Sequence, residues 1–327
     1  MIEALEQPVT AVNSFTKKQN LTRLIKREAL HLGFDYCGIA RADFQDNEKG
    51  KLENWLNNGF HGSMHYMARN PERRVDPQQL LPGAKSVISV LLNYYSSRKQ
   101  SDPAAPKISK YAFGTDYHIV MIERLEHLLS VMREHVPGLE GKICVDSAPV
   151  MEKTWAQRSG LGWIGKNTNL INKEKGSFFF IGEIITNAEL EYDRPLQDYC
   201  GTCTRCIDAC PTQAIIAPYI LDARKCISYL TIELKEEKMP PEFQDKMNGW
   251  VFGCDICQDV CPWNHFASEH NVPEFDPKTE LMNMNRQEWE DLTEGKFNEL
   301  CSDSPMQRAK YKGIRRNIAT ILQKEPG

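Results

Sequence analysis

The sequence predicts an α+β protein in which a cysteine-rich module follows an N-terminal domain of helices and strands. Helical and strand patterns alternate up to about residue 190, which favours one α/β or α+β domain in this part of the chain. Eight of the 11 cysteines lie between Cys200 and Cys261, and the last segment carries an amphipathic helical pattern. We therefore expect three parts, formed by residues 1–190, 191–268 and 269–327.

The spacing of apolar residues predicts the elements of the N-terminal domain. Residues 17–33 place apolar side chains on one helical stripe and end at a glycine that can cap a helix. Apolar runs without helical spacing predict strands over residues 34–40, 86–95, 142–149 and 177–186. A second helix, after Thr115, is predicted by apolar residues at helical spacing: Ile119, Ile122, Leu125, Leu129 and Met132. Residues 149–160 indicate a third helix with proline near its first turn.

Length, charge and hydropathy limit the classes of function. The 327 residues suffice for two or three compact domains. No apolar run approaches the roughly 20 residues needed to cross a bilayer, and residues 1–20 lack the pattern of a secretory signal, so we expect a cytoplasmic protein. A net charge of −4 argues against a surface that binds nucleic acid over its whole extent. In the reducing cytoplasm, the cysteines are expected to bind metal rather than to form disulfides.

The stretch CGTCTRCIDACP (200–211) has the spacing of bacterial ferredoxins, in which the fourth cysteine ligates the other of two clusters. A second run, C-x2-C-x3-C-P (254–262), lacks a fourth cysteine, and the isolated Cys226 must supply it. Crossing the proline-flanked cysteines assigns one [4Fe–4S] cluster to Cys200, Cys203, Cys206 and Cys261. The other cluster is assigned to Cys210, Cys226, Cys254 and Cys257. Zinc is the alternative metal, but eight cysteines with two C-P endings fit two clusters better.

Two other patterns are incomplete motifs. Gly160-x-Gly162-x-x-Gly165 matches the dinucleotide fingerprint, which requires a strand before it and a helix after it. Here a helix precedes the glycines and a strand-like segment follows, so we favour a loop, or a close approach of the backbone to a flat ligand, over an NAD site. Asp116-x-His118 matches the start of the D-x-H-x-x-G motif of cobalamin proteins, but the glycine is absent. We expect His118 on a helix surface, without a metal role.

Four further segments carry a resemblance to a known family. They are HGSMHYMARNPERRVDP (61–77), VDSAPVMEK (145–153), GLGWIGKN (160–167) and CDICQDVCPWN (254–264). With the cysteine runs, they resemble epoxyqueuosine reductases over residues 20 to about 265. That family is similar to reductive dehalogenases and to cobalamin-processing proteins. The resemblance implies a nitroreductase-like, cobalamin-binding domain, a ferredoxin-like module with two [4Fe–4S] clusters and a short HEAT-like helical segment at the C-terminal end.

The resemblance also implies a reaction and its partners. The reaction is the reduction of epoxyqueuosine to queuosine at the wobble position of tRNAs with GUN anticodons (those for Asp, Asn, His and Tyr), the last step of queuosine biosynthesis. Cob(I)alamin, bound base-off, would reduce the epoxide with electrons that reach it through the clusters. A low-potential donor such as flavodoxin or ferredoxin would supply those electrons. We expect a monomer, which suits an enzyme that embraces a tRNA stem-loop.

Asp146, in the VDSAP segment, matches the general acid of this family. Burial beneath a corrin would raise the pKa of its carboxyl group, which would then hold a proton at neutral pH. The alternative is that Asp146 or Ser147 only caps the helix that begins near Pro149. Polar contacts with the cofactor are expected from Arg69, Asp146, Lys166, Asn167, Asn169, Ser228, Tyr229, Gln258 and Asp259.

Basic residues in two segments are expected to contact phosphates of the anticodon stem. They are Arg73, Arg74, Arg308, Lys310, Lys312, Arg315 and Arg316. The alternative for such residues is a solvated helix face.

Two rival functions share part of the evidence. A reductive dehalogenase would use the same cofactors but usually carries a twin-arginine signal, which residues 1–20 lack. A ferredoxin-type electron carrier would need neither cobalamin nor a buried acid.

Overall fold

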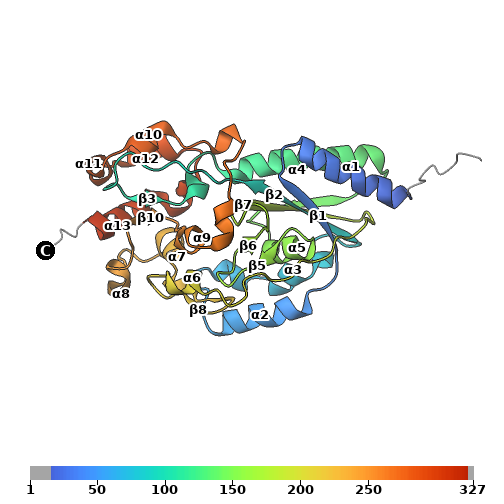
Figure 1. Cartoon of the computed structure of the whole chain (residues 1–327), viewed down its shortest axis with the longest axis horizontal. Helices are drawn as coiled ribbons and strands as arrows, with labels where there is room; N and C mark the ends of the chain where they lie inside the picture. The colour runs from blue at the N-terminus through green and yellow to red at the C-terminus, as the bar shows by residue number, and fades with distance from the viewer. Residues whose placement is uncertain (1–15, 323–327) are drawn as a thin grey trace, which may run out of the picture.

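The structure, a computed structural model, describes residues 16–322 and contains a four-stranded sheet in its N-terminal half (Figure 1). The strands, in spatial order, are β1 (Tyr36–Arg41), β2 (Ser86–Asn93), β7 (Phe179–Thr186) and β4 (Gly141–Cys144). Every neighbouring pair is antiparallel. The four predicted strands are confirmed, although β4 ends at Cys144 and the chain continues as a loop. Every residue of β2 is buried, which explains the lack of alternation in its sequence.

Helices cover both faces of this sheet. α1 (Lys17–His31) and α4 (Tyr117–His135) pack together on one face, where they form the largest apolar cluster with the strands. α5 (Glu152–Arg158) packs against the other face. The short helices α2 (Asp46–Asn57) and α3 (Pro71–Val75) contact each other beyond α5 (Figure 1). The fold is therefore α+β, as predicted.

The predicted apolar stripe of α4 is wrong in its first turn. Ile119 and Ile122 are 55% and 38% exposed, whereas Val120 and Met121 between them are buried. Four consecutive apolar residues cover every side of one helical turn, so their spacing alone does not identify the side that faces the core. The three predicted residues further along the helix are buried as expected.

The glycine motif leads from α5 into a hairpin formed by β5 (Trp163–Ile164) and β6 (Leu170–Ile171). A Cβ atom at Gly162 would lie 2.3 Å from the carbonyl oxygen of Ile171, so only glycine allows the two backbones to approach this closely. A helix precedes the motif and a strand follows it, the reverse of the dinucleotide arrangement. The preference against an NAD site is thus supported by the order of these elements.

Short elements separated by loops form the cysteine-rich module. They are α6 (Arg205–Asp208), β8 (Ile215–Ala217), β9 (Ile220–Leu221), α7 (Ile227–Ile232), α8 (Pro241–Gln244), β10 (Trp250–Phe252) and α9 (Ile256–Asp259). α6 and α9 contact each other, and each contains a cysteine. The two cysteine runs are therefore neighbours in space.

The C-terminal helices share a core with part of the N-terminal half. They are α10 (Thr279–Asn283), α11 (Arg286–Glu290), α12 (Glu294–Cys301) and α13 (Lys310–Leu322). Their apolar cluster includes side chains from residues 105–113 and from β10. In addition, β3 (Lys107–Ile108) pairs with β10 in parallel. The chain therefore crosses the boundaries at residues 190 and 268 that the sequence suggested, and the three parts are interleaved.

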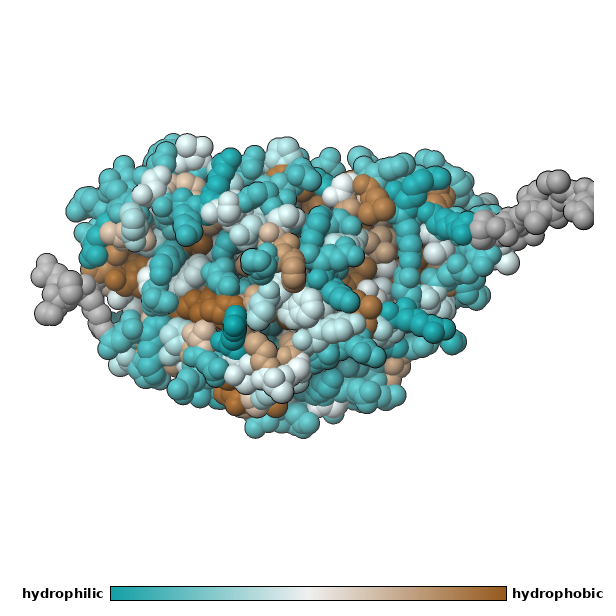
Figure 2. All heavy atoms as spheres, in the orientation of Figure 1, coloured by the Kyte–Doolittle hydropathy of each residue, from teal (hydrophilic) through white to brown (hydrophobic). Residues whose placement is uncertain are grey.

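The surface is mainly polar. Figure 2 shows hydrophilic side chains over most of one face, with apolar side chains in small groups between them. None of the helices between residues 16 and 322 has the length and apolar character needed to cross a lipid bilayer.

Candidate active site and cluster sites

The structure brings the cysteines of the first predicted cluster together. Burial raises the pKa of Cys206, and the nearby thiols of Cys261 and Cys200 raise it further. Burial also raises the pKa of Cys261, with added contributions from Cys200 and Cys203. Cys261 thus joins the first cysteine run despite its distance in the sequence. Because buried thiols resist ionisation, binding to iron is what would stabilise them as thiolates.

The cysteines of the second predicted cluster form another group. Burial raises the pKa of Cys254, and Cys226 and Cys210 add to this increase. The pKa of Cys257 is raised by burial and then by Cys226 and Cys254. All four side chains line one cavity of about 260 Å³. Within residues 16–322, no three metal-binding side chains converge closely enough for a single ion; a [4Fe–4S] cluster instead places four irons between its thiolates.

Four of the predicted cofactor contacts line the same cavity, namely Asn167, Asn169, Ser228 and Gln258. The Asn167 amide donates to the carbonyl oxygen of Cys257 at 3.3 Å, and the Asn169 amide lies 3.9 Å from the Cys257 sulfur. The Gln258 amide donates to the carbonyl oxygen of Ser177 at 3.0 Å. These contacts hold amide groups next to the second group of cysteines, where they can act on a cluster or on a neighbouring ligand.

Three other predicted contacts do not line the cavity. Lys166 donates to two carbonyl oxygens of the first cysteine run, at 2.6 and 3.0 Å. The Tyr229 hydroxyl accepts a hydrogen bond from the backbone N–H of Ser63 at 2.8 Å. Asp259 accepts a hydrogen bond from Lys110 at 2.8 Å. In the structure these side chains therefore hold segments of the protein together.

Asp146 lies in the loop after β4 and faces His118. Its side chain is 62% exposed, and its Oδ2 atom is 3.4 Å from Nε2 of His118. The other imidazole nitrogen, Nδ1, is 2.7 Å from Oδ1 of Asp116. These hydrogen bonds, first with Asp116 and then with Asp146, raise the pKa of His118 to about 9. The neighbour of Asp146 is therefore an imidazolium at neutral pH. The burial of Asp146 beneath a corrin stays a prediction.

The backbone of Asp146 also contacts a second carboxylate. Its N–H donates a hydrogen bond to Oε1 of Glu152, the first residue of α5. Burial raises the pKa of Glu152 to about 7, and the charge of Asp146 contributes to the increase. Sequence reasoning assigned no role to Glu152 or His118. The signals were the position of Glu152 in the VDSAPVMEK segment and the Asp116-x-His118 spacing.

Basic and aromatic side chains surround Asp146. Arg74 donates to the carbonyl oxygen of Tyr66 at 3.1 Å, and the guanidinium group of Arg308 lies 5.6 Å from the centre of the Tyr66 ring. An ion pair with Glu233 raises the pKa of Arg308, and Asp146 adds to this effect. Two of the predicted phosphate contacts thus lie close to Asp146 although they come from opposite ends of the chain. The predicted cofactor contact Arg69 is exposed in the same segment.

The remaining predicted phosphate contacts differ in their exposure. Arg73 and Lys310 are exposed, and Lys312 forms an exposed ion pair of 2.7 Å with Glu237. Arg315 donates to the carbonyl oxygen of Glu290 at 2.6 Å. Arg316 is half-buried and donates to the carbonyl oxygens of residues 230, 234 and 236. Arg315 and Arg316 therefore attach α13 to neighbouring elements.

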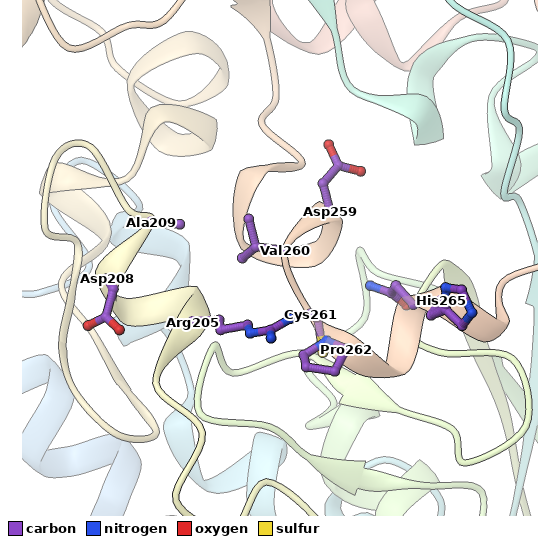
Figure 3. A pocket seen from close by; sticks show the side chains of 9 residues that line it. Arg205, Asp208, Ala209, Asp259, Val260, Cys261, Pro262 and His265 are labelled. Carbon is purple, nitrogen blue, oxygen red and sulfur yellow. The ribbon is translucent and has the colours of Figure 1, made fainter.

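An open hollow of about 720 Å³ lies between α6 and α9, next to Cys261. Figure 3 shows the side chain of Arg205 extending from α6 toward Cys261, with Asp259 and His265 on the other side of the hollow. The first group of cysteines is thus close to the surface, whereas the second lines the inner cavity.

Comparison with known proteins gives the family. The model of the epoxyqueuosine reductase QueG family matches residues 74–147, and that of a 4Fe-4S double cluster binding domain matches residues 199–264. Epoxyqueuosine reductases from Leadbetterella byssophila and Cellulophaga algicola are 52% and 50% identical to this chain. The matches cover 93% and 92% of it, and 99% and 98% of those proteins. This chain belongs to the epoxyqueuosine reductase family. It is an oxidoreductase with a module for two [4Fe–4S] clusters.

Solved structures of the epoxyqueuosine reductase family share the fold. One, in complex with an epoxyqueuosine-modified tRNA-Tyr stem loop, has a TM-score of 0.86 and 32% identity; the match covers 93% of this chain and 81% of that one. Another, from Bacillus subtilis, is described with its catalytic aspartate loop swung out of the active site. A catabolic reductive dehalogenase is more distant, with a TM-score of 0.50 and 18% identity, and shows a likeness of fold alone.

Proposed function

We propose that this protein reduces epoxyqueuosine to queuosine at the wobble position of tRNAs with GUN anticodons, in the cytoplasm and as a monomer. The observation that carries the proposal is the position of Asp146. Its carboxylate contacts a protonated histidine, and it acts electrostatically on Tyr111, which lines the cavity of the second cysteine group. Asp146 thus lies near the cavity of the second cysteine group, and reductive cleavage of a carbon–oxygen bond requires a proton donor and an electron donor in one space.

We further propose cobalamin, bound base-off, as the cofactor in that space. The side chains fit it in kind: Asn167, Asn169, Ser228 and Gln258 present amide and hydroxyl groups beside the cysteines, as the amide arms of a corrin require. The cavity is smaller than the roughly 300–1,000 Å³ of pockets that enclose whole ligands, so it would admit a cluster and only part of a corrin. When bound, cobalamin supplies the two-electron reduction.

The protein must supply protons to the oxygen that leaves. Converting the epoxide to an alkene consumes two electrons and two protons and releases the oxygen as water. Asp146 donates a proton to the alkoxide oxygen as the carbon–oxygen bond breaks. Because two protons are needed, a neighbour must return a proton to Asp146 after the first transfer. The His118 imidazolium supplies it through Nε2 and keeps its second proton on Nδ1, toward Asp116.

Electrons follow the two cysteine groups from the surface to the inner cavity. Cys200, Cys203, Cys206 and Cys261 hold the outer cluster, beside the open hollow. Cys210, Cys226, Cys254 and Cys257 hold the inner cluster. When bound, the outer cluster would accept electrons from a low-potential donor such as flavodoxin or ferredoxin. The tRNA approaches from the side of Asp146, near the half-buried Arg74 and the exposed Arg308. The exposed side chains of Arg73, Lys310 and Lys312 provide further contacts with its phosphates.

Anaerobic turnover of a stem-loop that contains epoxyqueuosine tests this function. Enzyme that holds both [4Fe–4S] clusters is supplied with a low-potential reductant, with and without cobalamin. The nucleosides are then analysed by mass spectrometry. We expect queuosine only with cobalamin, and a loss of at least about 100-fold in rate in Asp146→Ala with both clusters intact. Absence of queuosine from enzyme with full clusters and bound corrin would exclude the tRNA substrate.

A further inference from the structure

The backbone of Asp146 adopts a conformation that needs a restraint. Its φ angle is +50°, in the left-handed region that non-glycine residues seldom occupy. Within the loop, the backbone N–H and the hydroxyl of Ser147 both donate to the carbonyl oxygen of Val145, and the N–H of Val150 donates to that of Ala148. None of these groups belongs to Asp146, so another contact must keep its backbone in place.

Glu152 provides that contact from a rigid element. Its carboxylate oxygen Oε1 accepts the hydrogen bond from the N–H of Asp146. Glu152 begins α5, and the next turn of this helix is fixed by the buried side chains of Thr154, Trp155 and Ala156. The acceptor is thus attached to the sheet, whereas the donor lies in the loop. With the N–H of Asp146 held in this direction, its carboxylate points toward Nε2 of His118.

We propose that Glu152 is a positioning residue that latches the Asp146 loop in the active site by accepting the Asp146 backbone N–H. The proposal rests on the proposed function, because it assumes that the Asp146 carboxyl group acts on the substrate. It accounts for a restraint on a loop of the kind that is described as swung out in the Bacillus subtilis relative. Breaking the latch frees the loop without altering the acid itself.

Hydrogen exchange of the backbone amides, measured in enzyme that holds both clusters, tests the latch directly. In Glu152→Met, which retains the bulk but loses the acceptor, a peptide covering residues 143–150 should exchange about tenfold faster or more. Glu152→Gln keeps Oε1 as an acceptor and should restore most of the protection. Glu152→Ala serves if the methionine variant does not fold. Glu288→Met is the matched control, because it removes a carboxylate that accepts a backbone N–H, that of Asn285, at the start of α11.

Turnover of the same variants separates the latch from the acid. We expect kcat to fall about 10- to 100-fold in Glu152→Met, with little change in KM for the stem-loop, and to recover in Glu152→Gln. Unchanged exchange of residues 143–150 in Glu152→Met would overturn the latch, whatever the activity. Faster exchange with wild-type activity in both Glu152→Met and Asp146→Ala would leave the latch standing and overturn the role of Asp146 as the acid.

Discussion

At the scale of single residues, the active site depends on side chains that work through their neighbours. His118 would be unremarkable on a helix surface, but Asp116 and Asp146 make it a cation at neutral pH. The spacing of residues in the sequence could not predict this charge, because the loop that carries Asp146 approaches α4 only in the folded chain. The cysteines differ, because in the ferredoxin motif the fourth cysteine ligates the other cluster, and this rule predicted that Cys261 would lie near the first run despite its distance in the sequence.

The raised pKa of His118 predicts a change in stability with pH. The folded-state pKa is about 9 and the ordinary value is 6.5, so folding favours the protonated form. The resulting stabilisation is complete below pH 6.5 and is lost as the pH rises to about 9. We expect His118→Gln to remove about 1–3 kcal/mol of this dependence. Urea unfolding of both proteins at pH 6 and pH 9.5 measures it; equal slopes with pH would contradict the pairing.

The hydrogen bond from Asn169 to the Cys257 sulfur predicts an effect on the inner cluster. An N–H group directed at a cluster sulfur stabilises the reduced, more negative state, and its loss lowers the reduction potential. We expect Asn169→Leu to shift the midpoint of one cluster to a more negative value and to leave the other unchanged. A redox titration followed by electron paramagnetic resonance measures both. A shift in the midpoint potentials of both clusters, or of neither, would contradict this role of Asn169.

At the scale of elements, α13 connects the tail to the segments that flank the second cysteine group. Asn317 is fully buried and donates to the carbonyl oxygens of Thr231, in α7, and Val251, in β10. α7 follows Cys226 directly, and β10 ends two residues before Cys254. The amphipathic pattern predicted the helix itself. It did not predict that Arg315 and Arg316 face inward, because partners more than 20 residues away decide that.

Removing the Asn317 amide should therefore weaken both the fold and the cluster site. Asn317→Ala leaves two buried carbonyl oxygens without this donor, which we expect to cost about 2–4 kcal/mol of unfolding free energy. We also expect less iron per chain, since α7 follows Cys226 and β10 precedes Cys254, two proposed ligands of one cluster. Urea unfolding and iron analysis measure the two effects. Asn58→Ala, at an exposed side chain on the C-cap of α2, is the control and should change neither.

At the scale of the whole molecule, charge is distributed unevenly. The net charge is −4, yet Arg74 and Arg308 lie beside Asp146. The sequence predicted basic residues in both segments, and the resemblance to the family indicated their purpose. Their meeting around Tyr66 required the fold, because segments more than 200 residues apart supply them. The interleaving of the three parts likewise could not be predicted from sequence patterns that extend over only a few helical turns.

This arrangement predicts the salt dependence of tRNA binding. Arg308→Gln should weaken binding of the stem-loop several-fold and reduce the slope of log Kd against log salt by about 0.7–0.9, the value for one phosphate contact. Arg27→Gln, at an exposed arginine on α1, removes the same charge elsewhere and serves as the control. Fluorescence anisotropy at several salt concentrations measures both variants. Equal slopes for the two variants would place the tRNA on another face.

The pairing of β3 with β10 has a consequence for folding during synthesis on the ribosome. Residues 105–113 emerge long before residues 250–322, with which they share a core. Proteins made of independent domains can complete each domain during synthesis. Here residues 105–113, with one strand and several apolar side chains, lack these partners until the C-terminal helices have been translated. We therefore expect that neither half of this chain can be replaced by the corresponding half of a relative as an independent module.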